Sequence, residues 1–97
     1  MELLGAVFTC QVSPALTVVW LINDTNLNDI PQQDTIHHSC RITSNNGTSL
    51  EELTVRAGIQ YNGSSITCQV LNTDKNATAY LFLQGLFLPI SYMLIDH

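Results

Sequence analysis

The sequence predicts an all-β fold, and three observations carry that prediction. Residues 6–12 and 66–70 are short runs in which the side chains alternate between two faces, with apolar residues on one of them, as in strands that bury one face. Cys10 and Cys68 lie one in each run, 58 positions apart. The single tryptophan, Trp20, lies on a third apolar run. With 97 residues, the chain has the size of one domain with a modest core.

This arrangement of two cysteines and one tryptophan resembles the immunoglobulin superfamily. The resemblance implies an immunoglobulin-like antiparallel β-sandwich of about seven strands. It also implies a disulfide between Cys10 and Cys68, on facing strands of opposite sheets, packed against Trp20 in the core. Only five residues stand before Ala6, so we expect an incomplete first strand and a chain that is a fragment of a longer protein. A fibronectin-type sandwich, which lacks this cysteine pair, is the main alternative.

The first third of the chain predicts two strands and a loop. In residues 6–12 the inward side chains follow a two-residue alternation: Ala6, Phe8, Cys10 and Val12. After a turn at Pro14, residues 16–22 form the next strand, with an inward set of Leu16, Val18, Trp20 and Ile22. Residues 23–34 are rich in Asn and Asp, which predicts a loop with at most one short edge strand.

Residues 35–43 and 49–56 predict a hairpin, because the Asn46-Gly47 pair between them is a strong turn signal. On the second strand Leu53 and Val55 face inward, and this pair is similar to the family's Leu-x-Ile/Val signature. The short gap between Trp20 and this strand favours a constant or intermediate type of domain, because a variable type needs room for two more strands.

The last strands follow a corner at residues 57–65. Residues 66–71 form one strand and residues 78–84 the closing strand, with a polar turn between them. The analogy with the family turns Ala79, Leu81 and Leu83 of the closing strand inward. Where many family members have Asp-x-Gly-x-Tyr-x-Cys, this chain has Asn-Gly-Ser-Ser-Ile-Thr-Cys, so the tyrosine corner is absent.

The ends of the chain predict a division into two parts. We expect residues 1–85 to form the immunoglobulin-like domain. Residues 86–97 are an apolar C-terminal tail that should lie outside the sandwich, as a truncated membrane-proximal segment or as a flap folded onto the domain. The apolar run is well short of the ~20 residues that a membrane-spanning helix needs, and the first residues show no secretory signal. Any membrane attachment would use segments that are not in this sequence.

Charge and motifs narrow the partners and the compartment. The net charge is −5 with only three Lys and Arg residues, which argues against nucleic acid and against an anionic membrane surface. The implied disulfide requires an oxidising environment. Four N-glycosylation sequons begin at Asn23, Asn46, Asn62 and Asn76. We therefore expect a glycoprotein that is extracellular, at the cell surface or secreted.

No constellation for catalysis, a metal or a cofactor is visible, so we expect no enzyme. Glu51 and Glu52 are adjacent and point to opposite faces of a strand, so they cannot act as an acid and base pair. His37, His38 and Cys40 lack further ligands for a metal site. Cys40 should be a buried, unbonded thiol, and an intermolecular disulfide is the alternative.

Strand alternation also predicts a binding surface. If the inward sets above hold, five apolar side chains turn out on neighbouring strands and form one contiguous patch free of sequons: Val19, Leu21, Leu71, Tyr80 and Phe82. We expect a recognition module for cell adhesion or immune-type receptor binding, with a protein partner or homophilic self-association and no small-molecule substrate. The alternative is a structural spacer without a specific ligand. The missing first strand, the apolar tail or a neighbouring domain could instead cover the patch, or a one-residue shift of the closing strand could place Tyr80 and Phe82 in the core.

Overall fold

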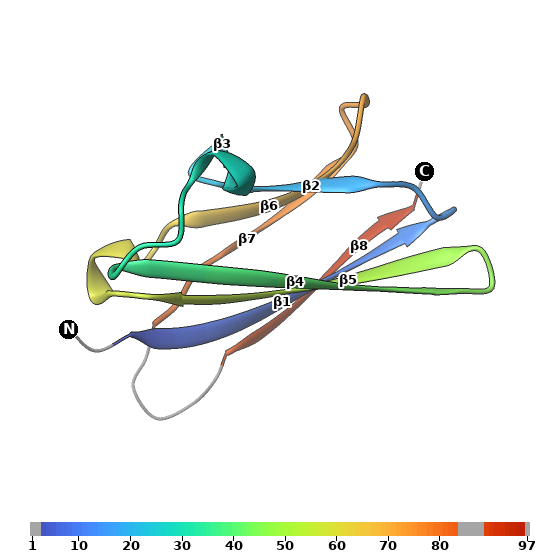
Figure 1. Ribbon diagram of the computed structural model, residues 1–97. Helices are drawn as coiled ribbons and strands as arrows, with labels where there is room; N and C mark the ends of the chain where they lie inside the picture. Colours follow the sequence, from blue (N-terminus) through green and yellow to red (C-terminus); the bar gives the residue numbers. More distant parts are fainter. Residues whose placement is uncertain (1–2, 84–88, 97) are drawn as a thin grey trace.

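The computed structural model describes residues 3–83 and 89–96. It is an all-β sandwich of two four-stranded sheets (Figure 1), as predicted. The first sheet has the order β4-β5-β1-β8, formed by β4 (Ile36–Asn45), β5 (Thr48–Ala57), β1 (Leu4–Ser13) and β8 (Ile90–Asp96). The second has the order β3-β2-β6-β7, formed by β3 (Thr25–Asn26), β2 (Val18–Ile22), β6 (Ser65–Val70) and β7 (Asn76–Tyr80). Two short 3-10 helices, η1 (Leu27–Asp29) and η2 (Ile59–Tyr61), lie in the connections.

The core forms because the inner faces of both sheets carry the apolar positions of the alternation. In β1, β2, β5 and β6 buried and partly exposed residues alternate along the strand. The predicted inward residues of β1 are all buried, as are Leu53 and Val55 of β5. Leu16 is an exception: β2 begins only at Val18, and Leu16 is exposed in the preceding segment.

The predicted hairpin between β4 and β5 is present. Asn45 pairs with Thr48, so the loop has two residues, and both Asn46 and Gly47 have positive φ. A two-residue loop with this backbone matches the twist of the flanking strands and favours Asn-Gly. The pairing continues along the whole of both strands, to Ile36 opposite Ala57.

The C-terminal segment corrects one prediction. Residues 90–96 do not lie outside the sandwich: β8 pairs with β1 in a parallel register, from Val7 opposite Ile90 to Ser13 opposite Asp96. Met93 and Ile95 are buried in the common core. The prediction failed because the segment is apolar on both faces and so lacks the polar outer face expected of an exposed strand. The side of β1 away from β5 is open to a further strand, and β8 pairs there.

The closing strand keeps the predicted register. Leu81 and Leu83 are buried and Ala79 packs against the core, while Tyr80 and Phe82 are exposed. A one-residue shift is therefore excluded. β7 ends at Tyr80, and its continuation is tied by two backbone hydrogen bonds, Leu81 N to Ser64 O and Gly63 N to Leu81 O. Among the described residues, no helix has the length and apolar character to cross a membrane.

Candidate functional site: two sheet edges and an inter-sheet cleft

The disulfide and its tryptophan form the centre of the sandwich. Cys10 on β1 and Cys68 on β6 are bonded, with an S–S distance of 2.06 Å, and so link the two sheets. Trp20 on β2 lies directly opposite Cys68 in the strand register. Its side chain is buried among the core residues. The implied disulfide is thus confirmed, and Trp20, Leu53 and Val55 are core residues.

The four sequon asparagines are all exposed. Asn23 and Asn46 lie in turns and have positive φ. Asn62 follows η2, and its side-chain oxygen accepts a hydrogen bond from Leu83 N at 2.8 Å. Asn76 is different, because it is the first residue of β7. The expectation that no sequon lies within the strands of the binding surface is therefore wrong. Whether any of the four carries a glycan stays a prediction.

The five predicted binding residues do not form one patch. Tyr80 and Phe82 are each 55% exposed and Leu71 is exposed, whereas Val19 and Leu21 are half-buried. Their outward direction was predicted correctly. The residues on β2 are separated from those on and after β7 because β6 lies between these two strands in the sheet.

The strand register shows how β6 divides the surface. Gln69 lies opposite Val19 and Thr67 opposite Leu21, so polar side chains separate these two residues from β7. Thr67 also hydrogen bonds to Thr78 of β7 across the outer face, with 2.9 Å between the hydroxyl oxygens. Tyr80 pairs with Ser65 at one end of β6, whereas Leu71 follows the other end. The expected contiguous patch is therefore wrong.

A second group of exposed apolar side chains was missed. Ile90, Tyr92 and Leu94 point outward from β8 and are among the most exposed large apolar residues, with Ile90 at 74%. Tyr92 donates its hydroxyl to Gln11 Oε1 on β1. β7 and β8 are the last strands of their sheets and contact each other. We call the exposed large apolar side chains on these two strands and just after β7 the apolar edge: Tyr80, Phe82, Ile90, Tyr92 and Leu94. Residues 90–95 are apolar on both faces, so no alternation in the sequence marks Ile90, Tyr92 and Leu94 as the outward side chains.

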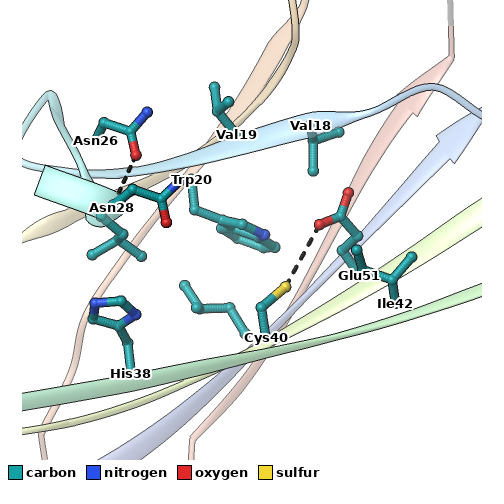
Figure 2. A pocket seen from close by; sticks show the side chains of 11 residues that line it. Val18, Val19, Trp20, Asn26, Asn28, His38, Cys40, Ile42 and Glu51 are labelled. Atoms are coloured by element: carbon teal, nitrogen blue, oxygen red, sulfur yellow. Dashed lines mark hydrogen bonds between the residues drawn. The ribbon is translucent and has the colours of Figure 1, made fainter. Parts of the chain in front are cut away.

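The opposite edge of the sandwich has a cleft between the sheets (Figure 2). It lies between β4 and β5 on one side and β2, β3 and η1 on the other, and it encloses a cavity of about 250 Å³. The side chains that line it are Val18, Val19, Trp20, Asn26, Leu27, Asn28, His38, Cys40, Ile42, Glu51 and Leu53. A neighbouring cavity of about 270 Å³ shares Val18, Ile42 and Glu51 with it.

The cleft exists because the second sheet is too small to cover β4. β4 has ten residues, whereas β3 has only two before the chain turns into η1. In Figure 1, β3 and η1 stand over one end of β4, and the rest of the hairpin extends beyond them. Ile36 is buried, but Ile42, an inward position of the same strand, is 65% exposed. Cys40 is exposed too, which corrects the prediction of a buried thiol. It is unbonded, as predicted.

Glu51 is the charged group of the cleft. It lies on the inner face of β5 and is only 4% exposed. Burial raises the pKa of Glu51 above its ordinary value, because the charged carboxylate loses its hydration. The thiol of Cys40 donates to Glu51 Oε1 at 3.5 Å. Partial loss of hydration where the thiol borders the cleft, and then the neighbouring charge of Glu51, raise the pKa of Cys40 to about 11. Cys40 is therefore a neutral thiol and a poor nucleophile at physiological pH.

His38, which the sequence offered as a possible metal ligand, has structural partners. His38 Nε2 donates to the carbonyl of Ile30 at 3.3 Å, and the backbone of His38 is bound on both sides by the amide of Gln32. Within residues 3–83 and 89–96, no three His, Cys, Asp or Glu side chains come together in a way that could hold a metal ion. Glu51 faces the core and Glu52 is paired with Arg41 on the outer face, so the two carboxylates do lie on opposite sides.

Comparison with known proteins identified no relative of this chain. No protein-family model matches the chain, and neither the curated proteins nor the solved structures contain a match.

Proposed function

We propose that this chain is an extracellular recognition module of the immunoglobulin superfamily, which acts in cell adhesion or immune-type receptor binding by contact with a protein partner or with a second copy of itself. The cysteine–tryptophan–cysteine core, with its disulfide between the two sheets, supports membership of the superfamily. The disulfide and the four sequons in exposed positions support an oxidising, extracellular location.

The observation that carries the proposal is the apolar edge. Five large apolar side chains, three of them aromatic, are exposed on two adjacent edge strands and the residues after β7. Tyr80 and Phe82 lie on the outer side of one sheet, whereas Ile90, Tyr92 and Leu94 lie on the outer side of the other, so the edge carries two exposed apolar rows. Exposed apolar rows of this kind are candidate interaction sites, and aromatic residues are enriched at the centres of protein interfaces. An edge strand also presents unpaired backbone groups that a partner strand can use. None of the four sequons lies on β8.

Of the five binding residues predicted from the sequence, Tyr80 and Phe82 remain the strongest candidates for contact with a partner. Val19 and Leu21 are half-buried, and a glycan on Asn76 would stand at the end of β7 near Gln69, which lies opposite Val19. A partner that used the apolar edge would avoid that glycan, because Tyr80 lies at the other end of β7.

The test compares charge substitutions on the apolar edge with one elsewhere. Phe82→Asp and Tyr92→Asp should each weaken self-association or binding of the labelled, multimerised protein to cells by about tenfold or more, because exposed aromatic anchors dominate interface energies. Sedimentation velocity over a concentration series measures self-association, and flow cytometry measures binding to cells. Thr43→Asp, an exposed polar position on β4, is the matched control and should change neither.

The competing function is a structural spacer that binds nothing. It requires the folded wild-type protein to stay monomeric and to bind no cell type, with both aspartate variants indistinguishable from it. That result would overturn the recognition proposal.

A further inference from the structure

β4 is an edge strand that is protected at one end. It is the last strand of its sheet, so in the described structure no strand lies on its side away from β5. At the start of β4 the preceding loop occupies that side: Ile36 and Gln33 exchange backbone hydrogen bonds of 3.0 and 3.3 Å. The side-chain amide of Gln32 donates to His38 O at 2.8 Å and accepts from His38 N at 2.9 Å. The loop therefore takes the place of a neighbouring strand as far as His38.

The rest of β4 has an open side. Along an antiparallel strand, the backbone N–H and C=O groups of every second residue point to the same side. Those of His38 point away from β5, because they bind Gln32, so those of Cys40, Ile42 and Ser44 point away from β5 as well. Among the described residues, no partner is present for these outward groups. We call residues 39–45 the open edge. Unpaired backbone groups of this kind are a template for a further strand.

We propose that the open edge pairs with the open edge of a second copy of the chain, antiparallel and about a two-fold axis at Ile42. Ile42 of each copy then lies opposite Ile42 of the other, and Cys40 lies opposite Ser44. The outward groups of each pair exchange two hydrogen bonds. The β4-containing sheets of the two copies become one continuous sheet, and the same residues serve both sides of the contact, as a two-fold interface requires.

The length of the open edge suits a second copy. It begins after His38 and ends at Asn45, where the chain turns back through Asn46 and Gly47. In the proposed register Asn45 of one copy lies opposite Ser39 of the other. The strand of each copy therefore ends just where the protected end of the other begins, and the open edge fills its own counterpart.

Charge and blocked groups select this register over its neighbour. A shift by one hydrogen-bonded step toward the protected end would place Ser44 opposite His38, whose outward groups are already bound by Gln32. It would also place Arg41 opposite Arg41, and like charges directly across two strands are destabilising. In the proposed register Arg41 lies opposite Thr43. β4 contains no Asp or Glu, so the net charge of −5 is not concentrated where the copies meet.

The side chains at the axis favour the same contact. Ile42 is 65% exposed, and pairing would bring two such side chains together on the inner face, where directly opposite residues interact. In Figure 1, β3 and η1 stand over the beginning of β4 and leave the hairpin end free. A two-fold axis at Ile42 places these coverings at opposite ends of the paired strands, so the covering of one copy does not lie over the open edge of the other.

This contact is separate from the apolar edge of the proposed recognition function. β4 and β8 are at opposite ends of one sheet, and β7 belongs to the other sheet. Sedimentation velocity of Ile42→Pro and Phe82→Asp side by side distinguishes the two surfaces. Association lost with Ile42→Pro and kept with Phe82→Asp supports pairing through β4. Association lost with Phe82→Asp and kept with Ile42→Pro supports the apolar edge and overturns the β4 pairing.

Substitutions at Ile42 separate backbone pairing from side-chain contact. Ile42→Pro removes an N–H that points away from β5, a place where an edge strand tolerates proline, and should weaken dimerisation about tenfold or more. Ile42→Thr keeps the N–H and a β-branched side chain, so it should weaken dimerisation only about two- to threefold. A wild-type protein that is monomeric at millimolar concentration would overturn the proposal, as would equal losses with the two variants.

A cysteine pair tests the register and decides the question if Ile42→Pro fails to fold. Opposite residues that exchange hydrogen bonds have Cα atoms about 5.5 Å apart, within the range for a disulfide. Ser44→Cys places the new thiol opposite Cys40 of the second copy, so mild oxidation should give a covalent dimer that dissociates on reduction. Thr43→Cys, one residue along and on the outer face, is the matched control and should stay monomeric on a non-reducing gel. Equal cross-linking of the two variants, or of neither, would overturn the register.

Discussion

At the scale of single residues, Glu51 and Glu52 show how one step along a strand changes the chemistry of a side chain. Glu52 is on the outer face, within 3.2 Å of Arg41, where an exposed ion pair contributes little to stability. Glu51 is on the inner face and has lost most of its contact with water. The inward assignment of Leu53 and Val55 already implied this, because Glu51 lies two residues before Leu53 on the same face.

The raised pKa of Glu51 predicts a pH dependence of folding. Because this pKa is higher in the folded than in the unfolded protein, the folded state holds the proton more tightly. The resulting stabilisation is complete below the ordinary pKa of 4.5 and is lost as the pH rises through the folded-state pKa. Glu51→Gln should remove this dependence and, at pH 7, raise the free energy of unfolding by on the order of 1 kcal/mol.

Urea denaturation at a series of pH values from about pH 4 upward measures this effect, with the Trp20 fluorescence as the signal. A Glu51→Gln protein with the same pH profile as the wild type would show that another group titrates.

At the scale of elements, β8 shows what alternation alone cannot decide. Both faces of β8 are apolar, so the strand lacks the polar outer face that identifies an exposed strand in a sequence. A strand of this kind can be predicted only if its pairing partner is known. That partner is the open side of β1, whose position depends on the whole topology. In contrast, the β4–β5 hairpin was predicted well, because its turn signal and both strands are local in sequence.

The structure predicts that β8 is a stabilising part of the domain. Ile95→Ala should lower the free energy of unfolding by about 2–4 kcal/mol, because Ile95 is 4% exposed and its truncation leaves a cavity in the core. Leu94→Ala, at the exposed neighbouring position, should stay within about 0.5 kcal/mol of the wild type. Chemical denaturation of both variants measures the difference. Equal effects of the two substitutions would mean that the segment does not pack as β8.

At the scale of the whole molecule, the centre was predictable and the edges were not. Cys10, Trp20 and Cys68 lie on strands whose alternation and spacing resemble a known family, so their meeting in the core could be expected. The cleft beside Cys40 could not be predicted from the sequence, because its existence depends on how far β3 and η1 extend over β4. The outward direction of the five predicted binding residues was correct, but the prediction that they form one patch was wrong. The patch is interrupted because polar residues of β6 lie between β2 and β7.

The disulfide should stabilise the whole sandwich, because it joins strands of different sheets that are 58 residues apart in sequence. Closing a loop of this length lowers the entropy of the unfolded chain by an amount equivalent to about 4 kcal/mol. Replacing both Cys10 and Cys68 by alanine should therefore lower the free energy of unfolding by roughly that amount, as measured by denaturation followed by Trp20 fluorescence. The control is Thr43→Ala at an exposed position of β4, which should change stability by less than about 0.5 kcal/mol. A double variant as stable as the wild type would show that the link between the sheets is dispensable, and the core packing around Trp20 would then have to hold them together alone.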